Sequence, residues 1–80
     1  MTITALLFAS YADAFGLASV ELALEPGARV SDALARLREM PGGGVLPAAP
    51  KVAVNLAYAR GDVVLAQGDE LAVIPPVAGG

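Results

Sequence analysis

GDELAVIPPVAGG, residues 68–80, is the stretch that decides how the rest of this 80-residue chain is interpreted. Residues 71–74 are apolar throughout, which is typical of a strand buried in the middle of a sheet. Pro75 and Pro76 cannot donate a backbone hydrogen bond to a sheet, so the strand must end before them. Proline also favours extended geometry in the residue before it. We therefore expect residues 77–80 to leave the body of the protein as a slim extended tail.

The tail ends in Gly79 and Gly80, which have no side chains. A frayed terminus is the simpler explanation of such a pair, since chain ends are often disordered and tolerate change. The alternative is mechanical, because a terminal carboxylate without neighbouring side chains could pass through a narrow channel into the active site of a partner. The residues that precede the pair decide between these explanations.

The composition indicates one small globular domain. Hydrophobic residues make up 56% of the chain and charged residues only 16%, which suits a domain that must fill a core although a chain of this size buries only about 60% of its surface. The apolar runs are far shorter than the ~20 residues needed to span a bilayer, and the N-terminus lacks the features of a signal peptide. We expect a cytoplasmic protein with no membrane partner.

The chain contains neither cysteine nor histidine. This excludes disulfides, zinc sites built from those residues, thiol nucleophiles and the commonest general base. The net charge of −3 and the scattered basic residues argue against a nucleic-acid partner. We expect no metal site and no bound cofactor, and the side chains are poor candidates for reactive groups.

Upstream of the tail, the hydrophobic pattern predicts one main helix and several short strands. Residues 32–40 place Leu34 and Leu37 on one face at helical spacing, with Ser31 as the expected N-cap. The other expected elements are a strand apolar on both faces at 2–9, a helical turn or loop closed by Gly16 at 10–16, an alternating strand at 20–24, a strand at 51–55 with Tyr58 on a short extension, a brief apolar strand at 63–66 and the last strand at 71–74.

This order of elements predicts a two-layer α+β domain. The first two strands should pair antiparallel, and the helix should cross one face of the sheet and bring the last strand parallel to the first. That is the β-grasp, or ubiquitin-like, arrangement, a mixed sheet with one main helix on one face. We expect residues 1–76 to form this domain and residues 77–80 to form the extended C-terminal tail.

The chain resembles the small subunits of molybdopterin synthase, which are ubiquitin-like sulfur carriers. The resemblance is sharpest in residues 68–80, with Gly-Asp-Glu, a hydrophobic strand, Pro-Pro-Val, a small residue and Gly-Gly. Weaker similarities are residues 7–9, residues 29–31 with Leu34, and residues 54–55. Where the family often carries Arg and Glu, this chain has Ala12 and Asp13, so one possible salt bridge to a partner is left open.

The resemblance implies a mechanism that centres on the terminal carboxylate of Gly80. A ubiquitin-activating-type adenylyltransferase would adenylate it with ATP and magnesium, and a sulfur donor such as a cysteine desulfurase would convert the adenylate to a thiocarboxylate. The large subunit of molybdopterin synthase, where the catalytic pocket is expected, would then transfer the sulfur to a pyranopterin precursor during molybdenum cofactor biosynthesis. This chain would be the non-catalytic small subunit.

The resemblance also implies a surface that binds the partner. Phe8, Tyr58 and Ile74 match a hydrophobic docking face of the family, and ordinary core residues are the alternative. We interpret Asp69 and Glu70 as turn acids rather than charges that steer a partner, and Asn55 as a structural hydrogen-bonding residue. The complete expected set is Phe8, Tyr58, Ile74, Pro75 and Pro76 for partner binding, Val77, Ala78 and Gly79 for the tail, and Gly80 as the reactive end.

Two other functions stay open on the sequence. One is a ubiquitin-like sulfur carrier for thiamine or tRNA thiolation, or a protein modifier, because the physical argument from the tail applies equally to these. The other is a β-grasp interaction module whose Gly-Gly ending is incidental. The identity of the sulfur donor and the oligomeric state are also left open.

Overall fold

The structure is a computed structural model that describes residues 1–76. The expected tail, residues 77–80, lies outside the described residues. The elements in chain order are β1 (Thr2–Leu7), α1 (Ala9–Phe15), β2 (Ser19–Ala23), α2 (Val30–Glu39), the 3-10 turn η1 (Gly43–Val45), β3 (Lys51–Val54), β4 (Ala57–Ala59) and β5 (Glu70–Ile74).

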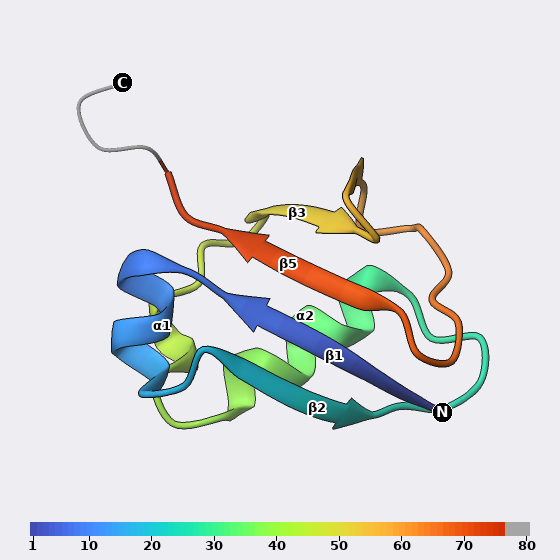
Figure 1. Cartoon of the computed structure of the whole chain (residues 1–80), viewed down its shortest axis with the longest axis horizontal. Coiled ribbons are helices and arrows are strands. Elements are labelled where there is room, and N and C mark those ends of the chain that lie inside the picture. Colours follow the sequence, from blue (N-terminus) through green and yellow to red (C-terminus); the bar gives the residue numbers. More distant parts are fainter. Residues whose placement is uncertain (77–80) are drawn as a thin grey trace.

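The strands form one mixed five-stranded sheet in the order β2-β1-β5-β3-β4. Strand β1 pairs antiparallel with β2 and parallel with β5, while β3 pairs antiparallel with both β5 and β4. Helix α2 lies across one face of this sheet (Figure 1). The predicted β-grasp fold, with its last strand parallel to its first, is therefore confirmed.

The core lies between the sheet and α2. The register sets Leu7 beside Val73 and Val73 beside Val52, and all three side chains are buried. Helix α2 contributes Ala33 and Leu37, which are fully buried. Period-2 alternation sends the intervening side chains of β1 and β5 to the opposite face of the sheet.

This opposite face, called here the outer face, corrects one expectation. The apolar residues of β1 and β5 were expected to be buried on both sides, but Leu6, Ala72 and Ile74 on the outer face are only half-buried. The central position of the two strands is as predicted. The apolar composition of both faces does not require burial on both sides, because a small domain with one main helix can cover only one face of its sheet.

Both helices differ in part from the sequence expectation. The segment expected as a helical turn or loop at residues 10–16 is a short helix, α1, and Gly16 closes it as expected, with a φ of 71°. Helix α2 starts at Val30, so its N-cap is Arg29 and not Ser31. The cause is Asp32, whose carboxylate accepts a 2.8 Å hydrogen bond from the backbone N–H of Arg29. An acid at the third position of a helix provides an acceptor for the backbone N–H of the residue that precedes the helix.

The expected strand at residues 63–66 is wrong. This segment makes one isolated bridge, from Val64 to Arg29, and its backbone is bonded to the start of α2. The fifth strand is instead β4, which forms a hairpin with β3 through Asn55 and Leu56 at φ values of 49° and 73°. Two positive φ values are the signature of the turn that matches the twist of paired strands. Tyr58 therefore belongs to a separate strand and not to an extension of β3.

Candidate functional site

The end of β5 positions the candidate site. Ile74 is the last residue of the strand and lies opposite Lys51, the first residue of β3. Pro75 and Pro76 follow and cannot continue the ladder, as the sequence predicted. The chain therefore leaves the sheet at this corner, immediately before the segment that ends in Gly80.

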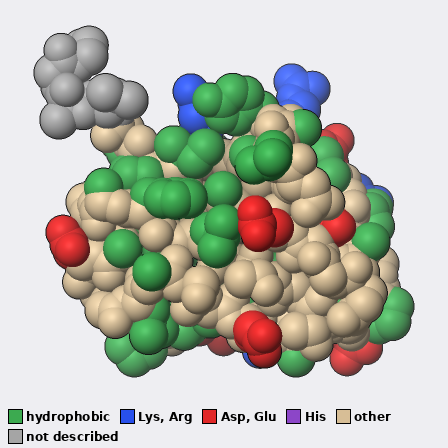
Figure 2. Space-filling view, in the orientation of Figure 1, with side chains coloured by type: hydrophobic (Ala, Val, Ile, Leu, Met, Phe, Trp, Pro, Cys, Tyr) green, Lys and Arg blue, Asp and Glu red, His purple; other side chains and the backbone are tan. Residues whose placement is uncertain are grey.

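A hollow of about 360 Å³ lies at this corner, and we call it the C-terminal hollow. It brings together most of the residues predicted for partner binding, namely Tyr58, Ile74, Pro75 and Pro76. Figure 2 shows apolar side chains gathered around the corner at which the described chain ends. The full lining is Tyr11, Pro47, Ala49, Pro50, Lys51, Tyr58, Ile74, Pro75 and Pro76.

Tyr58 is the most exposed aromatic side chain of this lining. It is 75% exposed, and the ammonium group of Lys51 lies 5.1 Å from the centre of its ring. A cation over an aromatic ring is attracted by the negative face of the ring. The hollow thus combines an exposed aromatic ring, one cation and proline walls, which suits recognition of another protein surface.

Phe8 lies next to this site without lining it. It is 46% exposed, so it is not a core residue, and it forms the N-cap of α1. Leu7 pairs with Val73, so the chain direction sets Phe8 beside Ile74 at the outer face of the sheet. The predicted tail residues Val77, Ala78 and Gly79 and the predicted reactive residue Gly80 lie outside the described residues.

A polar network fixes the opposite end of β5. The side-chain amide of Asn55 donates to a carboxylate oxygen of Asp69 over 2.9 Å, and its oxygen accepts from the backbone N–H of Glu70 over 3.0 Å. The other Asp69 oxygen accepts from the backbone N–H of Ala66 over 2.8 Å. The bond from Ala66, followed by that from Asn55, lowers the pKa of Asp69. The structural interpretation of Asn55 and of Asp69 as a turn acid is therefore confirmed.

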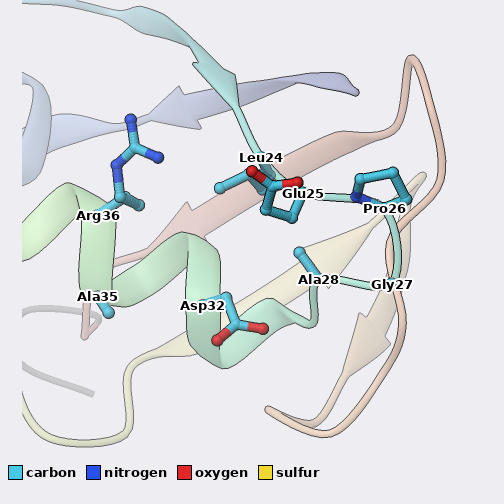
Figure 3. A pocket seen from close by; sticks show the side chains of 8 residues that line it. All are labelled: Leu24, Glu25, Pro26, Gly27, Ala28, Asp32, Ala35 and Arg36. Atoms are coloured by element: carbon cyan, nitrogen blue, oxygen red, sulfur yellow. The ribbon is translucent and has the colours of Figure 1, made fainter.

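A second hollow, of about 480 Å³, lies between the end of β2 and α2 (Figure 3). Two of its three charged side chains already have partners, because Asp32 caps α2 and Arg36 donates a 2.9 Å hydrogen bond to the carbonyl of Ala23, while the third is Glu25. It is larger than the C-terminal hollow but contains none of the residues predicted for function. We therefore place the candidate site at the end of β5.

No cluster of three or more acidic, histidine or cysteine side chains among residues 1–76 could hold a metal ion. Within the same range, no helix has the length and apolar character that crossing a membrane requires.

The sequence did not predict five of the nine residues that line the hollow. Tyr11 comes from α1, the loop after η1 contributes Pro47, Ala49 and Pro50, and Lys51 begins β3. No sequence pattern connects Tyr11 or this loop with the end of β5. The loop itself was recognised from its glycines and prolines, but its position against β5 depends on tertiary packing.

Comparison with known proteins gives a family and a set of similar structures. The model of the ThiS family matches residues 5–80. Small archaeal modifier protein 1 from Haloferax volcanii is 31% identical over 100% of both chains, with a TM-score of 0.87. A putative molybdopterin converting factor, subunit 1, from Pyrococcus furiosus is 27% identical over 96% of this chain and 99% of that one, with a TM-score of 0.83.

A third structure shares the fold at lower identity. It is the complex of subunits 1 and 2 of molybdopterin-converting factor from Helicobacter pylori, whose matching chain is 20% identical over 100% of both chains, with a TM-score of 0.74.

Proposed function

This chain belongs to the ThiS family of ubiquitin-like sulfur carriers, and from that premise we propose that it is the small subunit of a molybdopterin synthase. In this role it carries sulfur as a thiocarboxylate on Gly80 and delivers it to the pyranopterin precursor held by the large subunit. The chain supplies the sulfur, and the large subunit supplies the catalytic pocket.

The observation that carries the proposal is the C-terminal hollow. Tyr58, Ile74, Pro75 and Pro76 help to line it, and the two prolines come directly before the segment that ends in the reactive residue. Exposed apolar and aromatic surface of this kind is typical of a protein interface. A partner that docks there receives the C-terminal segment at the edge of the bound surface, which is where a sulfur-accepting pocket needs it.

The chemistry requires partners because a carboxylate is a poor electrophile. An adenylyltransferase of the ubiquitin-activating type lets the Gly80 carboxylate attack the α-phosphate of ATP, with magnesium, and pyrophosphate leaves. The outer sulfur of a cysteine persulfide on a donor such as a cysteine desulfurase then attacks the acyl carbon and AMP leaves. A thiol reduces the S–S bond of the acyl disulfide formed in this way, which frees the thiocarboxylate and returns the donor cysteine as a thiol. A chain that contains neither cysteine nor histidine suits this scheme, since it has no thiol or imidazole that would compete with its terminal carboxylate.

Two of the comparisons support this assignment. The Pyrococcus furiosus chain is described as a putative molybdopterin converting factor, subunit 1, and it matches along almost its whole length. The Helicobacter pylori structure is a complex of subunits 1 and 2 of molybdopterin-converting factor, so a chain of this fold pairs there with a second subunit.

The test is reconstitution. The thiocarboxylate form of the chain is mixed with the large synthase subunit of the same organism and the pyranopterin precursor, and molybdopterin formation is measured. We expect a stable complex and product whose amount rises with the amount of loaded chain. A loaded chain that neither binds the large subunit nor yields product contradicts the proposal.

Protein modification is the second candidate function. It is favoured by the 31% identity to small archaeal modifier protein 1 of Haloferax volcanii. The same activation mixture distinguishes the two when it is offered both the large synthase subunit and lysine-bearing acceptor proteins. Sulfur transfer to the precursor supports the synthase role, while amide conjugates of the chain on acceptor lysines support the modifier role.

A further inference from the structure

One wall of the C-terminal hollow is the loop of residues 47–50, which we call the proline wall. It contributes Pro47, Ala49 and Pro50 to the lining. The wall is anchored at its ends, because Leu46 before it is buried and Lys51 after it begins β3. Its two prolines have no backbone N–H, so the wall has few groups of its own with which to fix its position.

Arg38 supplies the missing contacts. Its Nη2 atom donates hydrogen bonds of 2.7 Å to the carbonyl of Pro47 and 2.9 Å to the carbonyl of Ala48. One guanidinium nitrogen carries two N–H groups and can serve both carbonyls at once. Among the hydrogen bonds of residues 1–76, no other reaches these two carbonyls.

Arg38 links the proline wall to a helix that is packed firmly on the core. It lies in the last turn of α2 and is half-buried, and its neighbour Leu37 is fully buried against the sheet. The planar guanidinium has a fixed fork geometry, which holds its acceptors in a defined direction. The wall is thereby held relative to β5, whose residues Ile74, Pro75 and Pro76 also line the hollow.

We propose that Arg38 is a positioning residue for docking of the large synthase subunit. It acts through the proline wall and makes no contact with the reacting atoms. This inference rests on the proposed function, in which the C-terminal hollow is the docking surface. A wall that was loose in the free protein would have to be ordered on binding, and that cost weakens association.

The same helix provides a matched control in Arg36. It carries the same charge and also donates from its guanidinium to a backbone carbonyl, that of Ala23, over 2.9 Å. Two residues correspond to about 200° around a helix, so Arg36 and Arg38 leave α2 on opposite sides. Arg36 lines the second hollow (Figure 3) and not the C-terminal one.

The experiment compares Arg38→Ala, Arg38→Lys and Arg36→Ala in the full chain. Dissociation constants for the large subunit are measured by calorimetry, and NMR order parameters of the Ala48 and Ala49 backbone amides are measured in the free chain. We expect Arg38→Ala to weaken docking about tenfold and to lower both order parameters. Arg38→Lys should recover part of the affinity, since an ammonium group still donates but lacks the planar fork. Arg36→Ala should change docking by less than about twofold.

The possible outcomes are distinguishable. Wild-type docking that is unaffected by Arg38→Ala overturns the positioning role while the proposed function stands. Equal weakening by Arg36→Ala and Arg38→Ala also overturns it, because general destabilisation would then explain both results. A wild-type chain that does not bind the large subunit overturns the proposed function and with it the docking role of Arg38.

Discussion

Truncation of Tyr58 to alanine separates docking from folding, because most of this side chain faces solvent. Tyr58 is 75% exposed, so about a quarter of its surface, roughly 50 Å², is buried. At ~25 cal/mol/Å² this burial contributes about 1 kcal/mol to the free energy of unfolding. The Lys51 ammonium, 5.1 Å from the ring centre, adds about 0.5 kcal/mol.

The expected loss of stability is therefore about 1.5 kcal/mol, which lowers the thermal midpoint by roughly 6–12 °C for a domain of this size. The effect on docking should be larger. An aromatic anchor inside an interface typically contributes ~2 kcal/mol or more to the free energy of binding, so its loss should raise the Kd for the large synthase subunit about 30-fold. Calorimetric titration of folded Tyr58→Ala into the large subunit measures this change.

Leu56→Ala is the matched control for this experiment. Leu56 lies two positions away in the same hairpin and is 94% exposed, but it does not line the C-terminal hollow. We expect its truncation to change the Kd by less than about twofold. Normal docking by Tyr58→Ala, or equal weakening by both variants, refutes the assignment of the hollow as the docking surface.

Phe8→Asp should weaken docking about tenfold while the domain stays folded, because Phe8 is 46% exposed and is an N-cap, where a favoured aspartate offsets part of the lost burial; an unfolded variant would show that Phe8 is core. The pKa of Asp69 is lowered in the folded chain, so the free energy of unfolding, measured with urea, should decrease as the pH is reduced below about 4 and the carboxylate is protonated. An equal decrease at low pH in Asp69→Asn, which has no carboxylate to protonate, contradicts this prediction. Gly42→Ala should lower the unfolding free energy by roughly 1–3 kcal/mol, since its φ is 90° and a Cβ would lie 2.2 Å from the carbonyl oxygen of Ala14. Gly44→Ala, with open space around its Cβ, should cost less than about 0.5 kcal/mol, and equal losses at the two glycines contradict the packing argument.

Structural features that depend on the properties of a single residue type, such as the ends of strands and helices, were predictable from the sequence. The end of β5 at Ile74 follows from two prolines that cannot donate to a ladder, and the end of α1 follows from Gly16 at a positive φ. The parallel pairing of β1 with β5 also followed, because one crossover helix leaves little choice of topology. These features are local, or they are fixed by the order of elements.

Features that depend on competition between segments were not predictable. Residues 63–66 have the composition of a strand, but their backbone bonds to the start of α2, and β4 takes the edge position instead. The turn before β4 was hidden because Leu56 occupies a position with positive φ that glycine usually fills.

The same limit applies to the candidate site. Tyr58 and Ile74 could be suggested as docking residues, but the sequence carries no signal that Arg38 holds the proline wall beside them. That contact joins the end of α2 to a loop nine and ten residues further along, and only the packed structure brings the two together.

The central claim is that the terminal carboxylate of Gly80 becomes a thiocarboxylate, and intact-mass measurement tests it most directly. The chain is incubated with the activating enzyme, ATP, magnesium, the sulfur donor and a thiol reductant, and its mass is compared with that of a variant lacking Gly80. We predict that the full chain gains the difference between sulfur and oxygen, located at Gly80. The variant should be unchanged, because its carboxylate falls about 3.5 Å short of the adenylating site. A full chain of unchanged mass, or a shortened chain that is thiolated normally, contradicts the account.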